Sequence, residues 1–177
     1  TTLELNPSGS KDTYVPTTIG MTSGKYYTEA KFISGVAYTY IGITDKPATA
    51  SKILGDFTNS VRLRGDDGTT RINNVASTTL TSFTTNDIIG IAVDLTNLKI
   101  YYSKNGVWMN SANPSSGTGG LTITAPDHAY FFAWQCNSGS SVCKYSWNFG
   151  NGTFGTTAVT TNSGNYRSWF STWLDMD

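Results

Sequence analysis

The chain has 177 residues, with 12 basic and 12 acidic residues and a formal net charge of zero. This length suits one domain. The basic residues form no cluster that could follow a phosphate backbone, and no apolar run is long enough to span a membrane, so neither nucleic acid nor a membrane is an expected partner. Aromatic residues make up 13% of the chain, Val, Ile and Thr are common, and no helical apolar stripe is sustained. This composition favours twisted sheets with many turns.

The first clear strand is predicted over residues 23–32, where the side chains alternate between two faces. One face holds Tyr26, Thr28, Ala30 and Phe32, and the other holds Lys25, Tyr27, Glu29 and Lys31. Alternation with a period of two is typical of a half-buried strand. We interpret the polar face of this strand as structural.

The next strand is expected over residues 36–44, followed by a long loop over residues 45–60. Loops longer than about 12 residues in a compact domain are usually functional or mobile. A short strand is predicted over residues 61–64. It ends in the Gly-Asp-Asp-Gly sequence of residues 65–68, which is typical of a turn.

Three consecutive antiparallel strands are predicted in the middle of the chain, over residues 88–94, 98–103 and 107–108. The last two are separated by Asn105-Gly106. Asn and Gly both tolerate positive φ, which a type I′ hairpin turn requires at two successive positions. Residues 110–120, rich in Gly and Ser, are by composition the most flexible stretch.

A final hairpin is predicted between strands 130–137 and 142–149, with Gly139-Ser140 as its two-residue loop. The facing pairs would be Cys136 with Cys143, Trp134 with Tyr145, Phe132 with Trp147 and Tyr130 with Phe149. Cross-strand aromatic pairs stabilise such a ladder, and a slip by one residue would place aromatic rings opposite polar side chains. The facing cysteines could form a disulfide or remain reduced and buried, and an oxidising compartment would favour the bond.

Four segments in this order resemble motifs of the SPRY (B30.2) domain. They are S-G-K-Y-Y-T-E-A at residues 23–30, Y-I-G-I at 40–43, D-I-I-G-I-A-V-D with the later K-N-G at 87–106, and N-F-G-N-G-T-F at 148–154. In the last motif Thr153 replaces the usual Pro. The resemblance covers about residues 20–154 of what we expect to be a single domain over residues 1–177, with residues 155–177 as a C-terminal aromatic extension.

This resemblance implies an all-β fold: a bent antiparallel β-sandwich of the concanavalin A-like jelly-roll type. Many short strands separated by turn signals favour a sandwich independently. The resemblance also implies rim loops that bind other proteins and occasionally glycans.

No catalytic site is expected. The single histidine, His128, follows Asp127 in a predicted turn, away from any recognisable nucleophile. A glycosidase needs two carboxylates about 5–9 Å apart. The only glutamates are Glu4, near the terminus, and Glu29, in a structural motif. We therefore predict a non-catalytic module without a cofactor.

Acidic residues at two turns could in principle bind calcium. These are Asp66 with Asp67, and Asp94 with Asn97. Neither pair has the spacing of a calcium-binding loop, and Asp and Asn are common turn formers. No metal site is predicted.

The candidate ligand-binding residues lie in loops expected at the rims of the sandwich. The loops are residues 45–60, 64–71 and 108–120, and the candidates within them are Arg64, Asp66, Asp67 and Trp108. Charged and aromatic side chains are the usual anchors of interfaces. Each of the four could instead be a solvated or capping side chain.

The biological setting of the protein is inferred from its composition alone. A chain rich in Thr, Ser, Asn and Gly is similar to virion proteins, so the first hypothesis is a phage head-decoration or tail component, with virion subunits, a protein or a cell-surface glycan as partner. A virion or extracellular location follows from it. The alternatives are a cytoplasmic adaptor that binds a peptide, and a carbohydrate-binding, lectin-like domain.

Overall fold

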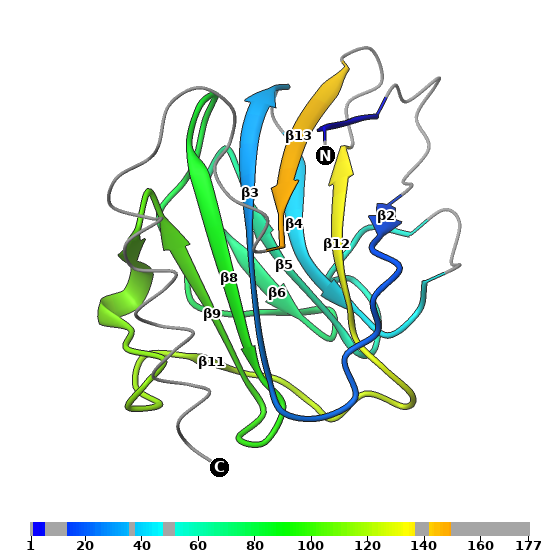
Figure 1. Cartoon of the computed structure of the whole chain (residues 1–177), viewed down its shortest axis with the longest axis vertical. Coiled ribbons are helices and arrows are strands. Elements are labelled where there is room, and N and C mark those ends of the chain that lie inside the picture. Colours follow the sequence, from blue (N-terminus) through cyan, green and yellow to red (C-terminus); the bar gives the residue numbers. More distant parts are fainter. Residues whose placement is uncertain (1, 6–13, 36–37, 48–51, 137–141, 150–177) are drawn as a thin grey trace.

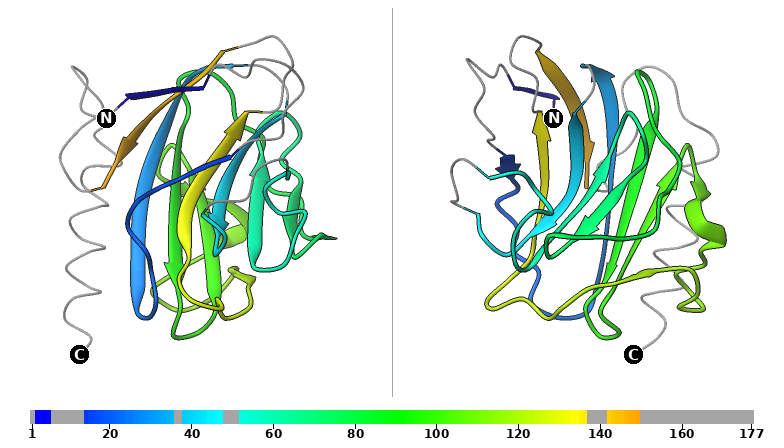
Figure 2. Two further views of the ribbon diagram at one scale, coloured as in Figure 1. Left: turned by 90° about the vertical axis from the view of Figure 1, so that its right-hand side faces the viewer. Right: turned by 180° about the vertical axis from the view of Figure 1, so that it is seen from behind.

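The computed structural model describes residues 2–5, 14–35, 38–47, 52–136 and 142–149. These residues form two antiparallel sheets that pack face to face (Figures 1 and 2). The predicted all-β sandwich is therefore confirmed. Within the described ranges, no helix is long and apolar enough to cross a membrane.

The first layer, sheet A, has seven strands in the order β1-β13-β3-β8-β9-β10, with β11 also paired to β9. Its strands are β1 (Thr2–Leu5), β3 (Lys25–Ser34), β8 (Ile88–Asp94), β9 (Lys99–Lys104), β10 (Val107–Trp108), β11 (Leu121–Thr122) and β13 (Cys143–Asn148). The second layer, sheet B, has six strands in the order β2-β12-β4-β5-β6-β7. They are β2 (Tyr14–Pro16), β4 (Thr39–Thr44), β5 (Ser60–Arg64), β6 (Thr70–Ile72), β7 (Val75–Ala76) and β12 (Phe131–Cys136).

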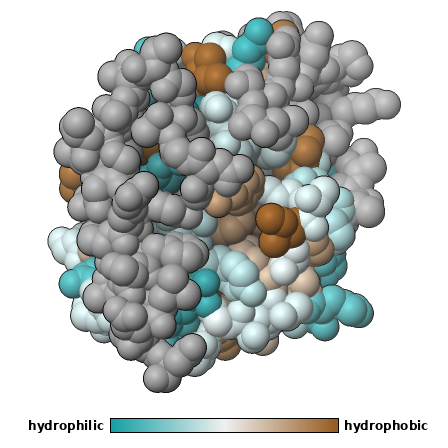
Figure 3. Space-filling view, viewed as in Figure 1, coloured by the Kyte–Doolittle hydropathy of each residue, from teal (hydrophilic) through white to brown (hydrophobic). Residues whose placement is uncertain are grey.

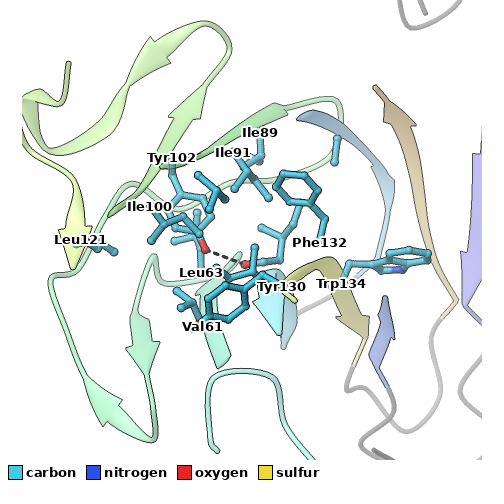
Figure 4. Packing of buried hydrophobic residues seen from close by; sticks show 14 of the residues in the cluster. Val61, Leu63, Ile89, Ile91, Ile100, Tyr102, Leu121, Tyr130, Phe132 and Trp134 are labelled. Atoms are coloured by element: carbon cyan, nitrogen blue, oxygen red, sulfur yellow. Dashed lines mark hydrogen bonds between the residues drawn. The ribbon is translucent and has the colours of Figure 1, made fainter. Parts of the chain in front are cut away.

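The hydrophobic core lies between the two inner faces (Figure 4). Ile89 and Ile91 from β8 meet Ile41 and Leu63 from sheet B, and all four are fully buried. Tyr102 is also buried, and its hydroxyl donates to the backbone oxygen of Ile41 at 3.4 Å. Burial raises the pKa of the Tyr102 hydroxyl. The alternating apolar positions of the strands thus fill one continuous core.

The predicted central strands are confirmed as β8, β9 and β10. At the β9–β10 turn, Asn105 has φ 50° and Gly106 has φ 82°, so both residues adopt the positive values expected of this hairpin. The amide oxygen of Asn105 also accepts the backbone N–H of Ile88 at 2.8 Å. This bond ties the turn to the start of β8.

The predicted final hairpin is wrong, because β12 and β13 belong to different sheets. β12 pairs with β2 and β4, whereas β13 pairs with β1 and β3. Most of the predicted side-chain partners nevertheless meet across the core. The rings of Trp134 and Tyr145 lie 6.3 Å apart, and those of Phe132 and Trp147 lie 6.4 Å apart. Phe149, however, lies beside Phe132 at 6.3 Å.

The two cysteines join the ends of these strands. Cys136 ends β12, Cys143 begins β13, and the structure links them by a disulfide with their Cα atoms 6.0 Å apart. The bond therefore connects sheet B to sheet A. The predicted loop at Gly139-Ser140 lies outside the described residues, as does the whole extension 155–177.

The described residues 52–59, which lead into β5, pack across the outer face of sheet B. The buried side chain of Gln135 accepts the backbone N–H of Leu54 at 2.7 Å and donates to the backbone oxygen of Lys52 at 3.2 Å. Leu54 and Phe57 form a small apolar cluster with Tyr40. This part of the long loop covers the sheet and does not extend from the rim.

The segment predicted to be most flexible, residues 110–120, forms a compact hydrogen-bonded loop. Its first two residues belong to a short 3-10 turn, η1 (Met109–Ser111). Asn113 and Thr118 form an isolated β-bridge, and the Asn113 amide oxygen accepts the N–H of Ser115 at 3.1 Å.

Candidate interaction site at one rim of the sandwich

Several connections meet at the upper end of the molecule in Figure 1. Antiparallel pairing places them there, because Tyr40 of β4 lies opposite Arg64 of β5 and Ile89 of β8 lies opposite Lys104 of β9. The β3–β4 and β5–β6 loops, the segment before β8 and the β9–β10 turn therefore share this end.

Arg64 is the centre of a charged cluster at this rim. Its Nε lies 2.5 Å from Oδ1 of Asp66, and its Nη2 lies 2.7 Å from Oδ2 of the same carboxylate. Its Nη1 also lies 3.4 Å from Oδ2 of Asp67. The hydrogen bond from Arg64 is the main reason that the pKa of Asp66 is lowered, and the same bond raises the pKa of Arg64. This two-pronged pair fixes the direction of the guanidinium plane.

The guanidinium lies over the ring of Tyr38, with its central carbon 4.4 Å from the ring centroid. Tyr38 is 47% exposed and has φ 69°. A non-glycine residue in this left-handed region is strained by about 1–3 kcal/mol, and such residues gather at functional sites. Tyr38 is not among the residues predicted from the sequence, because residue 38 was expected inside a strand that in fact begins at Thr39.

Asp67 acts mainly as a turn former. Its Oδ1 accepts the backbone N–H of Thr69 at 2.9 Å and the Thr69 hydroxyl at 2.7 Å. Gly68, with φ 72°, has no room for a side chain, because a Cβ there would lie 2.0 Å from the backbone oxygen of Leu80. This turn holds Asp66 and Arg64 in place.

A pocket of about 270 Å³ opens beside the Arg64 cluster. Phe32 and Phe83 line it, with their rings edge-to-face at 5.8 Å. Asp66 in the β5–β6 loop and Lys104 at the end of β9 add charged groups to the lining. Lys104 Nζ lies 3.0 Å from Oδ2 of Asp87, so both charged groups of the pocket have counterions within the rim. We call the pocket together with Tyr38 and Arg64 the rim site.

The structure does not bring Trp108 to the rim site. Trp108 lies on sheet A, where its ring is edge-on to Tyr27 at 6.2 Å. The candidate loop 45–60 starts at the opposite end of β4, because Thr44 pairs with Ser60. Of the predicted residues, only Arg64, Asp66 and Asp67 come together.

The acidic turns show no metal site. Both carboxylate oxygens of Asp94 accept bonds from Asn97, at 2.9 Å from its backbone N–H and 2.8 Å from its side-chain amide. Within the ranges that the structure describes, no group of three or more His, Cys, Asp or Glu could hold a metal ion.

A family model for the SPRY domain matches residues 25–132, which is more than half of the chain. The chain belongs to the SPRY family. No curated protein matches its sequence. SPRY domains generally mediate protein–protein interaction and are typically non-catalytic modules.

Solved SPRY structures share the fold. The SPRY domain of human HERC1 superposes with a TM-score of 0.66 and 21% identity, over 82% of this chain and 87% of that one. A second human SPRY domain superposes with a TM-score of 0.63 and 16% identity, over 86% and 93%. At these identities the likeness shows the fold alone. These matches give no support to a viral source, a virion role or glycan binding.

Proposed function

We propose that this SPRY domain recognises a partner protein by binding a peptide segment at the rim site. The observation that supports the proposal is the exposed Tyr38–Arg64 stack beside a pocket lined by Phe32 and Phe83. Aromatic and arginine side chains dominate the energetics of protein interfaces. A strained, exposed tyrosine clamped by an arginine is already ordered for binding, so little further entropy is lost.

The pocket indicates what kind of side chain it accepts. Its phenylalanine rings favour an apolar or aromatic group, and the lining residues Asp66 and Lys104 offer hydrogen bonds at the mouth. Each of these charges is already paired with a neighbour, Arg64 or Asp87. We therefore expect the affinity for the peptide to change little with ionic strength.

Peptides selected from a displayed library of random linear sequences would test this proposal. Titration of the selected peptides should show that Tyr38→Ala and Arg64→Ala each weaken binding by about tenfold or more, as expected for central interface residues. Val75→Ala is the matched control, because Val75 is 66% exposed on β7, away from the rim site. Peptides that bind the wild type and both rim variants equally would contradict the proposal.

The other hypotheses from the sequence predict different ligands. Glycan-array binding that is lost in Trp108→Ala would favour the lectin-like alternative, and copurification with assembled particles would favour a virion component. A peptide ligand without a glycan ligand would favour the peptide-binding adaptor.

A further inference from the structure

The disulfide lies at the same end of the sandwich as the rim site. Figure 1 shows that β12 ends and β13 begins at this upper end. Cys136 is the last residue of β12, and its partner across the β12–β4 ladder is Thr39, which lines the rim pocket. In Figure 3 the described surface at this end combines apolar residues, coloured brown, with hydrophilic residues, coloured teal. The disulfide is therefore adjacent to one side of the pocket wall.

The second sulfur lies against the other side of the pocket wall. A Cβ built on Gly35 would lie 3.1 Å from Sγ of Cys143 and 2.8 Å from the ring of Phe32. Gly35 and Phe32 both line the pocket. The space beside Gly35 is thus filled, and the sulfur, the glycine and the ring form one packed group. A shift of the Cys143 sulfur has to move this group.

The strand ladders that hold this part of the wall end or shift at the disulfide. Thr39 opposite Cys136 is the last pair of the β12–β4 ladder. On the other sheet, the register of β13 against β3 shifts between Lys144 and Tyr145, immediately after Cys143. Strand ends open more easily than strand centres. The disulfide therefore links the two sheets covalently where hydrogen-bonded pairing holds the pocket wall less firmly.

Reduction of the disulfide changes the packing around both sulfurs. Cys136 is 2% exposed and Cys143 is 0% exposed, so neither thiol could turn into solvent without local opening. Two sulfur atoms that are no longer bonded repel each other at bonding distance, and they separate to van der Waals contact. Because the Cys143 sulfur already packs against Gly35 and Phe32, this separation displaces the pocket wall.

We propose that the Cys136–Cys143 disulfide is a redox switch for the rim site, which binds a peptide segment in the oxidised chain and binds it more weakly after reduction by a dithiol. This inference rests on the proposed function of the rim site. A thiolate of the dithiol attacks one cysteine sulfur, the S–S bond breaks, and the second thiol of the reagent displaces the cysteine from the mixed disulfide. Two electrons and two protons pass to the cysteines, and the dithiol becomes a cyclic disulfide. By linkage, a bound peptide makes the disulfide harder to reduce by the same factor.

Amide hydrogen exchange tests the switch without a ligand, by comparing the oxidised chain with the same chain reduced by dithiothreitol. The N–H of Gly65 donates to the oxygen of Thr39 at 2.8 Å, and the N–H of Phe83 donates to the oxygen of Gly65 at 2.7 Å. All three residues line the pocket. We expect reduction to speed exchange at these two amides at least about tenfold. The N–H of Leu95, bonded to the oxygen of Gly24 at the opposite end, is the control and should change little. Unchanged exchange at the pocket amides, or equal acceleration at Leu95, would overturn the proposal.

Titration of peptides selected on the oxidised chain gives the second test. We expect the reduced chain to bind them at least about tenfold more weakly. Cys136→Ala with Cys143→Ala is the matched control, because dithiothreitol should change neither its peptide affinity nor its exchange rates. Equal affinity of the oxidised and reduced wild type, with binding still weakened in Arg64→Ala, would overturn the switch and leave the proposed function intact. Selected peptides whose binding does not depend on Arg64 would overturn the proposed function itself, so the two failures are distinguishable.

Discussion

Glu29 lies where water hardly reaches, and its hydroxyl partner Tyr27 only partly compensates for the lost hydration. Burial raises its pKa in the folded protein above the usual 4.5. The folded state therefore binds this proton more tightly than the unfolded state. It follows that the contribution of Glu29 to stability falls as the pH rises from the unfolded-state pKa through the folded-state pKa.

Glu29→Gln should remove the free-energy cost of burying a charged carboxylate. The amide oxygen of the glutamine can still accept the hydrogen bond from the Tyr27 hydroxyl. We expect the variant to have a higher free energy of unfolding than the wild type at pH 7, with a smaller difference at a pH below 4.5. Urea unfolding at both pH values measures this. A difference from the wild type that is the same at both pH values would contradict the raised pKa of Glu29.

Strands and loops of this chain are held in place by contacts between residues that are far apart in the sequence. Gln135 on β12 holds the loop residues Lys52 and Leu54 against the outer face of sheet B. Its position in the alternating pattern of β12 predicts an outward direction, and only the packed loop makes that position buried. Arg62 adds to this layer with its guanidinium 3.2 Å from Asp56 and 4.5 Å above the ring of Tyr40.

Gln135→Ala should show how strongly the packing of this loop depends on the Gln135 side chain. The backbone N–H of Leu54 would lose its acceptor while remaining buried, which costs about 1–3 kcal/mol. We expect a lower free energy of unfolding and faster hydrogen exchange at the Leu54 amide. Val75→Ala, at an exposed site on β7, serves as the control and should change both by little. Unchanged exchange at Leu54 would mean that other contacts hold the loop.

The disulfide acts on the whole molecule, because it connects the two sheets through β12 and β13. Its sequence separation is only 7, and loop-closure entropy for so short a loop corresponds to about 2 kcal/mol of stability. Cys136→Ala with Cys143→Ala should therefore lower the free energy of unfolding by about that amount. Urea titration measures the loss, and a thiol assay of protein purified without reductant should find neither cysteine reactive. Two reactive thiols would instead support the reduced pair.

Local chemistry was sufficient to predict much of this SPRY domain. The alternation in residues 25–32 and the positive φ values at Asn105-Gly106 follow from side-chain periodicity and turn preference. These properties depend on neighbours within a few residues, so one sequence contains them. The order of the SPRY motifs is a property of the sequence as well.

The tertiary structure alone decided how these pieces are connected in space. Inward-facing alternation is the same whether two strands are hydrogen-bonded neighbours or face each other across a core, so β12 and β13 were assigned to one hairpin instead of two sheets. Strand pairing also explains which of the predicted residues come together at the rim site. Tyr38 joins Arg64 only because β4 and β5 are paired, and Trp108 is separated from them because its ring packs against Tyr27 on sheet A. Strand pairing over long distances in the sequence is not encoded in local periodicity.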